Sequence, residues 1–231
     1  MHISKLSICI AALLIGLPCL SWADYKSAVA AHNRGDYVTA FREFKALAEK
    51  GDPSSQYNLG QMYASGKGVP QDFVAASSWF HKAAEQGDSG AQSILGQMYF
   101  AGHGVHQNYR TAAYWWRKAA EQGDIPAAYN LGSLYLNGQG IKQSFPEAFN
   151  WTKKAAERGF AMAQNNLGFM YANGYGVAQD NIYAYAWGSL AAAQGVDMAN
   201  KLVVDLTTRM SSNQIAEAKR LVITLRSGSG R

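Results

Sequence analysis

The pattern of hydrophobic positions along the chain repeats every 36 residues. A Leu-Gly pair recurs four times at this spacing, with a small residue four positions before each leucine and a tyrosine four positions after it. The pairs are Leu59-Gly60, Leu95-Gly96, Leu131-Gly132 and Leu167-Gly168. Such a stripe has helical periodicity, and a fixed period of this length is typical of solenoids built from stacked supersecondary units. The four copies are expected at residues 52–87, 88–123, 124–159 and 160–195.

Each copy is predicted to contain two helices, because residues that cap helix N-termini precede both segments. Before the first helix stand Asp52, Asp88, Asp124 and the poorer cap Phe160; before the second stand Asp72, Asn108, Ser144 and Asp180. Tryptophans at 79, 115, 151 and 187 are expected to pack inward from the second helix, which a left-handed glycine ends. The glycine after each leucine costs up to about 1 kcal/mol inside a helix. We therefore expect it to mark a close approach between helices.

The loop between the helices of a copy holds two glycines two positions apart, as in Gly66-Lys67-Gly68. Glycine-rich loops also cradle phosphates, but no Gly-Lys-Ser/Thr sequence follows here. The same loop occurs in all four copies, so a tight turn is the favoured interpretation.

These motifs resemble those of the Sel-one-like repeat (SLR) family, a variant of the tetratricopeptide repeat. The pattern is Leu-Gly-x-x-Tyr-x-x-Gly-x-Gly-Val, then Ala-x-x-Trp-x-x-Lys-Ala-Ala and a closing glycine, over about residues 52–195. The resemblance implies an all-α, right-handed superhelical α-solenoid of helix-turn-helix repeats. The fourth copy departs from it at Leu190, where the other copies have lysine. We expect Leu190 to face a capping element.

Capping helices are expected on both sides of the repeats, because the terminal units of a solenoid must cover an apolar face. Residues 24–51 resemble a tetratricopeptide helix pair, and residues 196–226 are predicted to form two helices. The inward residues of the first are Met198, Leu202, Leu206 and Met210; those of the second, which a capping box from Ser211 to Gln214 opens, are Ile215, Val222 and Leu225. Residues 227–231 are expected to be a disordered tail.

The first 23 residues have the features of a secretory signal peptide. Lys5 precedes an apolar run from Ile8 to Leu17, and Ser21-Trp22-Ala23 provides small residues at the cleavage positions. Cleavage is expected after Ala23, which predicts a periplasmic or secreted protein without a transmembrane segment. The alternatives are an uncleaved anchor and a lipoprotein anchor at Cys19, which the preceding Gly16-Leu17-Pro18 does not favour.

The residue composition argues against several classes of function for this chain, among them thiol chemistry, nucleic-acid binding, metal binding and catalysis. Both cysteines, Cys9 and Cys19, lie in this leader, so the mature chain is expected to have no disulfide, thiol nucleophile or thiolate metal site. Charged residues make up only 16% of the chain and the net charge is +5, which does not favour nucleic-acid binding. His103 and His106 share one loop without an evident third ligand, so we expect no metal and no cofactor. No pattern of catalytic groups stands out, and the chain is not expected to be an enzyme.

Ligand contacts are expected on the inner wall of the superhelix, which the first helices form in tetratricopeptide-like solenoids. Offsets of minus two, plus two and plus five from each leucine lie opposite the core stripe. The residues are Tyr57, Gln61 and Ala64; Ser93, Gln97 and Phe100; Tyr129, Ser133 and Leu136; and Asn165, Phe169 and Ala172. Amides can bind an extended peptide backbone, and aromatic rings add rigid contact area. The alternative is a solvated groove, with contacts made elsewhere.

The function expected from these features is that of a non-catalytic adaptor or scaffold that binds a protein or peptide on its concave face. The resemblance implies the same, since the family's members are mostly scaffolds and its exported bacterial members often mediate envelope or host-cell interactions. A module that binds cell-wall glycan or peptidoglycan is the alternative. A β-lactam hydrolase is a third hypothesis, but the family branch linked to that activity carries cysteine pairs that the mature chain lacks.

Overall fold

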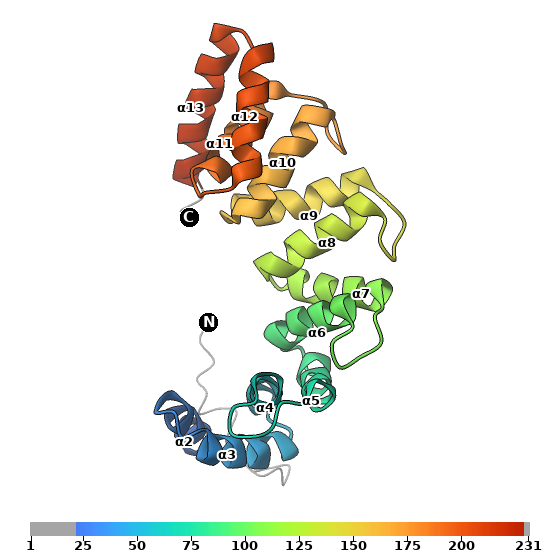
Figure 1. Ribbon diagram of the computed structural model, residues 1–231, viewed down its shortest axis with the longest axis vertical. Coiled ribbons are helices and arrows are strands. Elements are labelled where there is room, and N and C mark those ends of the chain that lie inside the picture. The colour runs from blue at the N-terminus through green and yellow to red at the C-terminus, as the bar shows by residue number, and fades with distance from the viewer. Residues whose placement is uncertain (1–21, 229–231) are drawn as a thin grey trace, which may run out of the picture. The chain divides into compact units, whose positions relative to one another are not determined.

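The computed structural model describes residues 22–228, in which helices are joined by short loops and no strand occurs (Figure 1). The helices are α2 (Trp22–Asn33), α3 (Tyr37–Glu49), α4 (Pro53–Ser65), α5 (Phe73–Glu85), α6 (Ser89–Ala101), α7 (Tyr109–Glu121), α8 (Ile125–Asn137), α9 (Phe145–Glu157), α10 (Ala161–Asn173), α11 (Asn181–Ala192), α12 (Asp197–Arg209) and α13 (Ser212–Gly228). The predicted all-α fold of paired helices is confirmed. Of the expected signal peptide, residues 1–21 lie outside the described part of the chain.

The chain divides into two compact units, and the boundary falls inside α6, between Ala91 and Gln92. In the first unit α2 packs on α3, α3 on α4, and α4 on α5. In the second unit each helix from α7 to α11 packs on the next in the pairs α7–α8, α8–α9, α9–α10 and α10–α11. Consecutive helices packed in this way form an α-solenoid.

The predicted caps define the helix starts. Asp52, Asp88 and Asp124 each accept a hydrogen bond from the backbone N–H three residues on, at 2.7, 2.7 and 2.8 Å. The four polar residues expected before the second helices cap those helices in the same way. Phe160 caps α10 without a side-chain hydrogen bond. The capping residues in the sequence therefore predicted the helix starts within the repeats correctly.

The glycine after each leucine lies where two helices of one repeat come closest. A Cβ on Gly96 would lie 2.3 Å from Cδ1 of Trp116, and a Cβ on Gly132 would lie 2.7 Å from Oγ1 of Thr152. On Gly168 it would meet the backbone oxygen of Ala184 at 3.0 Å. The expected close approach is confirmed, and it compensates for the helix propensity that each glycine gives up.

The loop glycines pack against the preceding repeat. Gly176 has a φ of +74°, and a Cβ there would lie 2.1 Å from the backbone oxygen of Phe145, at the start of α9. Gly140 contacts the start of α7 in the same manner, with Tyr109 Cβ 2.4 Å from the position of a Cβ. The recurrence of this loop thus has a packing reason, in agreement with the tight turn that the sequence predicted.

Glutamine pairs, each made of one buried and one exposed residue, join helix ends in three of the four repeats. The second glutamine of each pair donates from Nε2 to Oε1 of the first: Gln86 to Gln56 at 2.7 Å, Gln122 to Gln92 at 2.8 Å and Gln194 to Gln164 at 2.7 Å. Gln164 also donates to the carbonyl oxygen of Ala156, at the end of the preceding repeat, at 3.2 Å. Each pair therefore satisfies polar groups that would otherwise be buried without partners.

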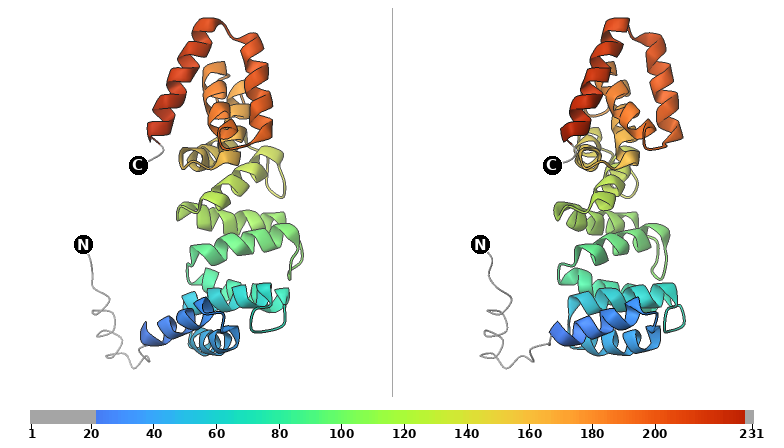
Figure 2. Two further views of the ribbon diagram at one scale, coloured as in Figure 1. Left: turned by 60° about the vertical axis from the view of Figure 1, so that its left-hand side comes forward. Right: turned by 90° about the vertical axis from the view of Figure 1, so that its left-hand side faces the viewer.

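The C-terminal helices cover the last repeat. Helix α11 packs against both α12 and α13, which diverge from their connecting turn (Figure 2). Leu190 is buried in the same cluster against which Val222 and Leu225 of α13 pack, so the expectation that it faces a capping element is confirmed. The capping box is also present, since Ser211 N–H donates to Oε1 of Gln214 at 2.9 Å and Gln214 N–H donates to Oγ of Ser211 at 3.3 Å.

Two details of this end differ from expectation. Met198, expected to face inward, is 65% exposed, because the buried stripe of α12 runs through Ala199 and Leu206, with Leu202 against Gly188, and Met198 lies off this stripe. Helix α13 also continues through Ser227 and Gly228, into the segment expected to be a tail. Ser227 Oγ donates to the carbonyl oxygen of Thr224 at 2.8 Å, which satisfies an acceptor in the last turn. Residues 229–231 lie outside the described part of the chain.

Replacing Gly176 by alanine is expected to destabilise the protein more than replacing Gly159 by alanine. Both glycines have positive φ, which costs an alanine about 1–2 kcal/mol, but a Cβ on Gly159 would meet no atom within 4 Å. At Gly176 the clash with Phe145 adds about 1–3 kcal/mol of strain. Urea unfolding followed by circular dichroism measures both. Equal losses would show that the contact between loop and helix contributes nothing.

Candidate functional site

The second unit contains a cavity of about 360 Å³, here called the inner pocket, on the side of the first helices. It is lined by Gln97 and Phe100 of α6, Trp116 of α7, Tyr129, Asn130, Ser133, Leu134, Leu136 and Asn137 of α8, Gln139 of the following loop, and Asn166 of α10. Its volume falls within the range of about 300–1,000 Å³ that is usual for ligand sites.

Two aromatic side chains form one wall of the inner pocket. The ring of Trp116 lies across Gly96, and its Nε1 donates to the carbonyl oxygen of Ser93 at 3.2 Å. Phe100 packs on Trp116 with 5.4 Å between ring centroids. Because Trp116 is buried and hydrogen-bonded, this wall is fixed before any ligand binds.

Tyr129 and Ser133 lie one helical turn apart on α8. The ring of Tyr129 packs on Phe160, with 5.1 Å between centroids. Phe160 stands where the other repeats have a capping aspartate, so the residue that weakens the cap of α10 also supports Tyr129. Ser133 Oγ donates to the carbonyl oxygen of Tyr129 at 3.1 Å, which leaves the hydroxyl oxygen able to accept.

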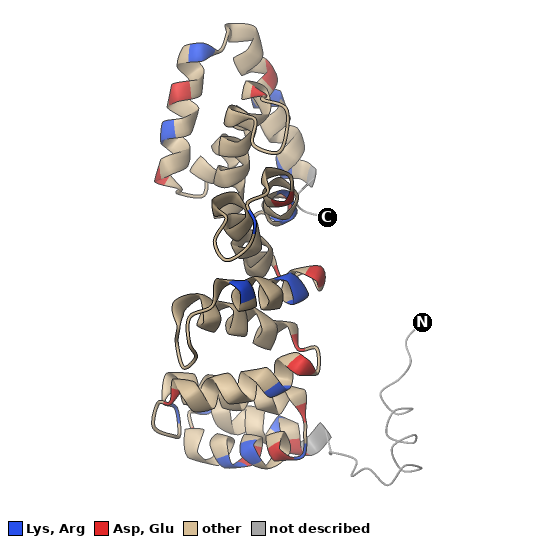
Figure 3. Cartoon of the chain, turned by 90° about the vertical axis from the view of Figure 1, so that its right-hand side faces the viewer, with Lys and Arg blue, Asp and Glu red and all other residues tan. Residues whose placement is uncertain are grey.

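The amide groups of the inner pocket are available for a ligand. Gln97, Asn130, Asn137 and Gln139 make no side-chain hydrogen bond to any described residue, and Asn166 accepts one weak bond at 3.4 Å. Each amide offers two donors and a carbonyl acceptor. No lining residue carries a charge, and Figure 3 shows how few charged positions the repeats hold.

The structure brings together four of the nine candidate residues: Gln97, Phe100, Tyr129 and Ser133 line the inner pocket, as does Leu136. Ser93 instead donates to the carboxylate of Asp124 at 3.0 Å. Asn165 is only 6% exposed, and Phe169 is 44% exposed but packs on Tyr175, outside the lining.

Tyr57 and Gln61 belong to the first unit. Tyr57 accepts a hydrogen bond from Nε2 of Gln61 at 2.9 Å and packs on Phe80 with 5.8 Å between ring centroids. Their side chains therefore bind one another and the repeat that contains them.

Several lining residues were missed by the sequence analysis. Asn130 and Asn166 stand one position before the leucine, outside the predicted offsets, although asparagine occupies this position in three of the four repeats. That recurrence of a polar residue beside a core leucine was the available signal. Trp116 lies one position after the recurring tryptophan, so the repeat pattern did not single it out.

The described residues hold no arrangement that indicates catalysis or metal binding. Hydrogen bonds from Thr39 lower the pKa of Asp36, which caps α3. Burial raises the pKa of Tyr171, with smaller contributions from nearby Tyr183, Asp180 and Glu157. Neither residue lines the inner pocket. Within residues 22–228 no three His, Cys, Asp or Glu side chains gather as a metal site requires. No helix in this range combines the length and hydropathy needed to cross a bilayer.

Comparison with protein families finds four copies of the Sel1 repeat, at residues 53–88, 89–124, 125–160 and 161–196. Among solved structures, a protective antigen of uropathogenic Escherichia coli strains that displays an SLR fold is 31% identical, with a TM-score of 0.78. The match covers 95% of this chain and 47% of the antigen, so the chain spans about half the length of that relative.

A Sel1 repeat protein from Oxalobacter formigenes is 32% identical, with a TM-score of 0.73, over 78% of this chain and 74% of the other. Comparison with curated proteins gave no match. The similarity to the Escherichia coli antigen, over 95% of this chain, includes the terminal helices as well as the four repeats.

Proposed function

The chain belongs to the Sel1-repeat family, and from this premise we propose that it is an exported adaptor that binds a protein or peptide in the inner pocket of its second unit. Sel1-repeat proteins are generally non-catalytic scaffolds for protein interactions. The observation that carries the proposal is the row of unpaired amides beside a fixed aromatic wall, without any charged side chain.

The chemistry of the inner pocket favours an extended, uncharged segment of a partner. The free amides of Gln97, Asn130 and Asn137 can donate to and accept from a peptide backbone, which presents one donor and one acceptor per residue. Phe100 and Trp116 offer apolar contact to side chains between these hydrogen bonds. A charged side chain would find no counter-ion in the lining and would lose hydration, so neutral residues are preferred.

Export rests on the features of residues 1–23 and is supported by the Escherichia coli relative, which is described as a protective antigen. The adaptor would then act in the periplasm or outside the cell.

Cleavage after Ala23 predicts a mature chain that begins at Asp24. The full-length protein, expressed in a Gram-negative host, should appear in the periplasmic fraction with the intact mass of residues 24–231. A Leu13→Arg variant should keep the full mass, because a charge interrupts the apolar run. Full-length protein confined to the cytoplasm in both cases would contradict export.

A Ser133→Arg substitution should block the inner pocket without removing any of its aromatic contacts. Of the peptides that residues 24–231 select from a random library, those that the variant binds about tenfold more weakly or worse are expected to be uncharged. Asn150→Arg is the matched control, since it adds the same side chain at an exposed position of α9. Affinity should there change by less than about twofold. Equal binding by parent and Ser133→Arg would place the peptide site elsewhere.

Binding of a cell-wall glycan is the second candidate. Phe145 and Tyr175 stack in parallel, with 4.6 Å between centroids and 7° between planes, and Phe169 lies beside Tyr175. Such aromatic clusters also offer sugars apolar contact. Peptidoglycan fragments titrated into the parent protein and a Phe169→Ala variant decide between the candidates. Fragment binding that a Phe169→Ala variant abolishes, with no selected peptide bound, would replace the adaptor proposal.

A further inference from the structure

The third repeat lacks the hydrogen-bonded glutamine pair that the other three repeats share. Ala128 stands at the position of Gln56, Gln92 and Gln164, and Arg158 stands at the position of Gln86, Gln122 and Gln194. In the other repeats the first glutamine is buried at the end of a helix and accepts a hydrogen bond from the exposed second glutamine. In the third repeat a different arrangement occupies this place.

A cavity of about 200 Å³, here called the repeat-three pocket, lies at this position. Its lining consists of Ala120, Gly123, Asp124, Ile125, Ala128, Lys154, Glu157 and Arg158, and it shares no residue with the inner pocket. The carbonyl oxygen of Ala120 accepts a backbone hydrogen bond from Gly123 at 3.0 Å but receives no side-chain amide. The equivalent oxygens of Ala48 and Ala156 each receive one from a glutamine.

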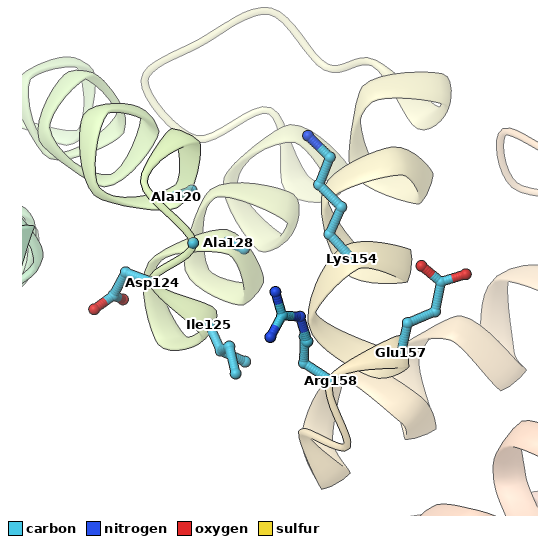
Figure 4. A pocket seen from close by; sticks show the side chains of 8 residues that line it. Ala120, Asp124, Ile125, Ala128, Lys154, Glu157 and Arg158 are labelled. Carbon is cyan, nitrogen blue, oxygen red and sulfur yellow. The ribbon is translucent and has the colours of Figure 1, made fainter. Parts of the chain in front are cut away.

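The basic side chains of this pocket are not neutralised by its acidic ones. The Arg158 side chain makes no hydrogen bond or ion pair to any described residue, and Nζ of Lys154 lies 4.0 Å from the centroid of the Trp151 ring. Glu157 instead pairs with Lys153 at 3.6 Å. Figure 4 shows the guanidinium of Arg158 directed towards α8, with the carboxylate of Glu157 pointing away from it.

Asp124 is also occupied. Its Oδ1 accepts from the backbone N–H of Ala127 at 2.8 Å and from Oγ of Ser93 at 3.0 Å. In Figure 4 this carboxylate points to the side opposite Lys154 and Arg158. The space between α8 and α9 is therefore bordered by two cations whose charges are not paired within the pocket.

We propose that the repeat-three pocket binds a carboxylate group. A guanidinium offers two parallel N–H donors that match the two oxygens of a carboxylate, and Lys154 adds a second cation at the rim. The volume is below that of sites for drug-sized ligands, so it suits one acidic side chain, a peptide C-terminus or a small organic acid. The ligand occupies the space beside Ala128, where the other repeats hold a buried glutamine, and it gives Arg158 an acceptor that no described residue provides.

The test refills the pocket with the pair that the other repeats carry. Sodium glutarate, the peptide acetyl-Ala-Glu-Ala-amide and its glutamine analogue are titrated into residues 24–231, and the Nε–Hε signal of Arg158 is followed by NMR. Glutarate or the glutamate peptide should shift this signal, and the glutamine peptide should not. The Ala128→Gln, Arg158→Gln variant copies a pair found three times in this fold, and thermal unfolding checks that it is folded.

Lys154→Gln keeps Arg158 as the reporter and should weaken binding about tenfold, because hydrogen bonds to charged groups contribute roughly that factor. Lys142→Gln, which removes one charge from a loop outside the pocket, should leave affinity within about twofold. The double variant, followed through backbone signals of Ala120 and Gly123, should no longer respond.

A shift caused by the glutamate peptide alone identifies a protein as the source of the carboxylate. A shift caused by both glutarate and the glutamate peptide shows that a free organic acid can also bind. No shift with either acid, an equal shift with the glutamine peptide, or an unchanged response of the double variant would overturn the proposal.

Discussion

The contact between the two helices of each repeat, at the glycine that follows the core leucine, is the constraint on which the rest depends. Because Gly96 has no side chain, the ring of Trp116 can lie across α6 and its Nε1 can donate to the carbonyl oxygen of Ser93. That tryptophan then forms the wall of the inner pocket with Phe100. At Gly168 the partner position is Gly188, and the two backbones approach directly, with Leu202 of α12 over both. The same glycine position thus shapes the inner pocket in one repeat and a capped end in another.

The repeats vary on the inner face of the first helix rather than at its core contacts. The core leucines, the small residues and the glycines are nearly constant from copy to copy, whereas the position two after each leucine holds Gln61, Gln97, Ser133 or Phe169. A change at such a position alters the surface without altering the close helix contact. The break in the glutamine pair at Ala128 and Arg158 follows the same logic, since the helices around it keep their length and caps.

The sequence predicted those features that depend on local chemistry. Helix starts followed from capping residues, and the glycine contacts followed from the cost of glycine in a helix, because both depend on a few neighbouring positions. The inner face was predicted less well. The angular position of a residue around a helix gives the direction of its side chain but does not show which other element covers it. Asn165, for example, is buried on α10, and α12 also packs against that helix. The glutamine pairs join residues 30 positions apart, and only the fold shows that they meet.

The most direct test of the central claim, that the inner pocket receives the partner, is site-specific photo-crosslinking in the native host. A photoreactive amino acid replaces Gln97, at the exposed edge of the pocket, or Asn150, on the exposed surface of α9. The account predicts that a protein is captured from position 97 and not from position 150. Capture from position 150 alone, or equally from both, would contradict it.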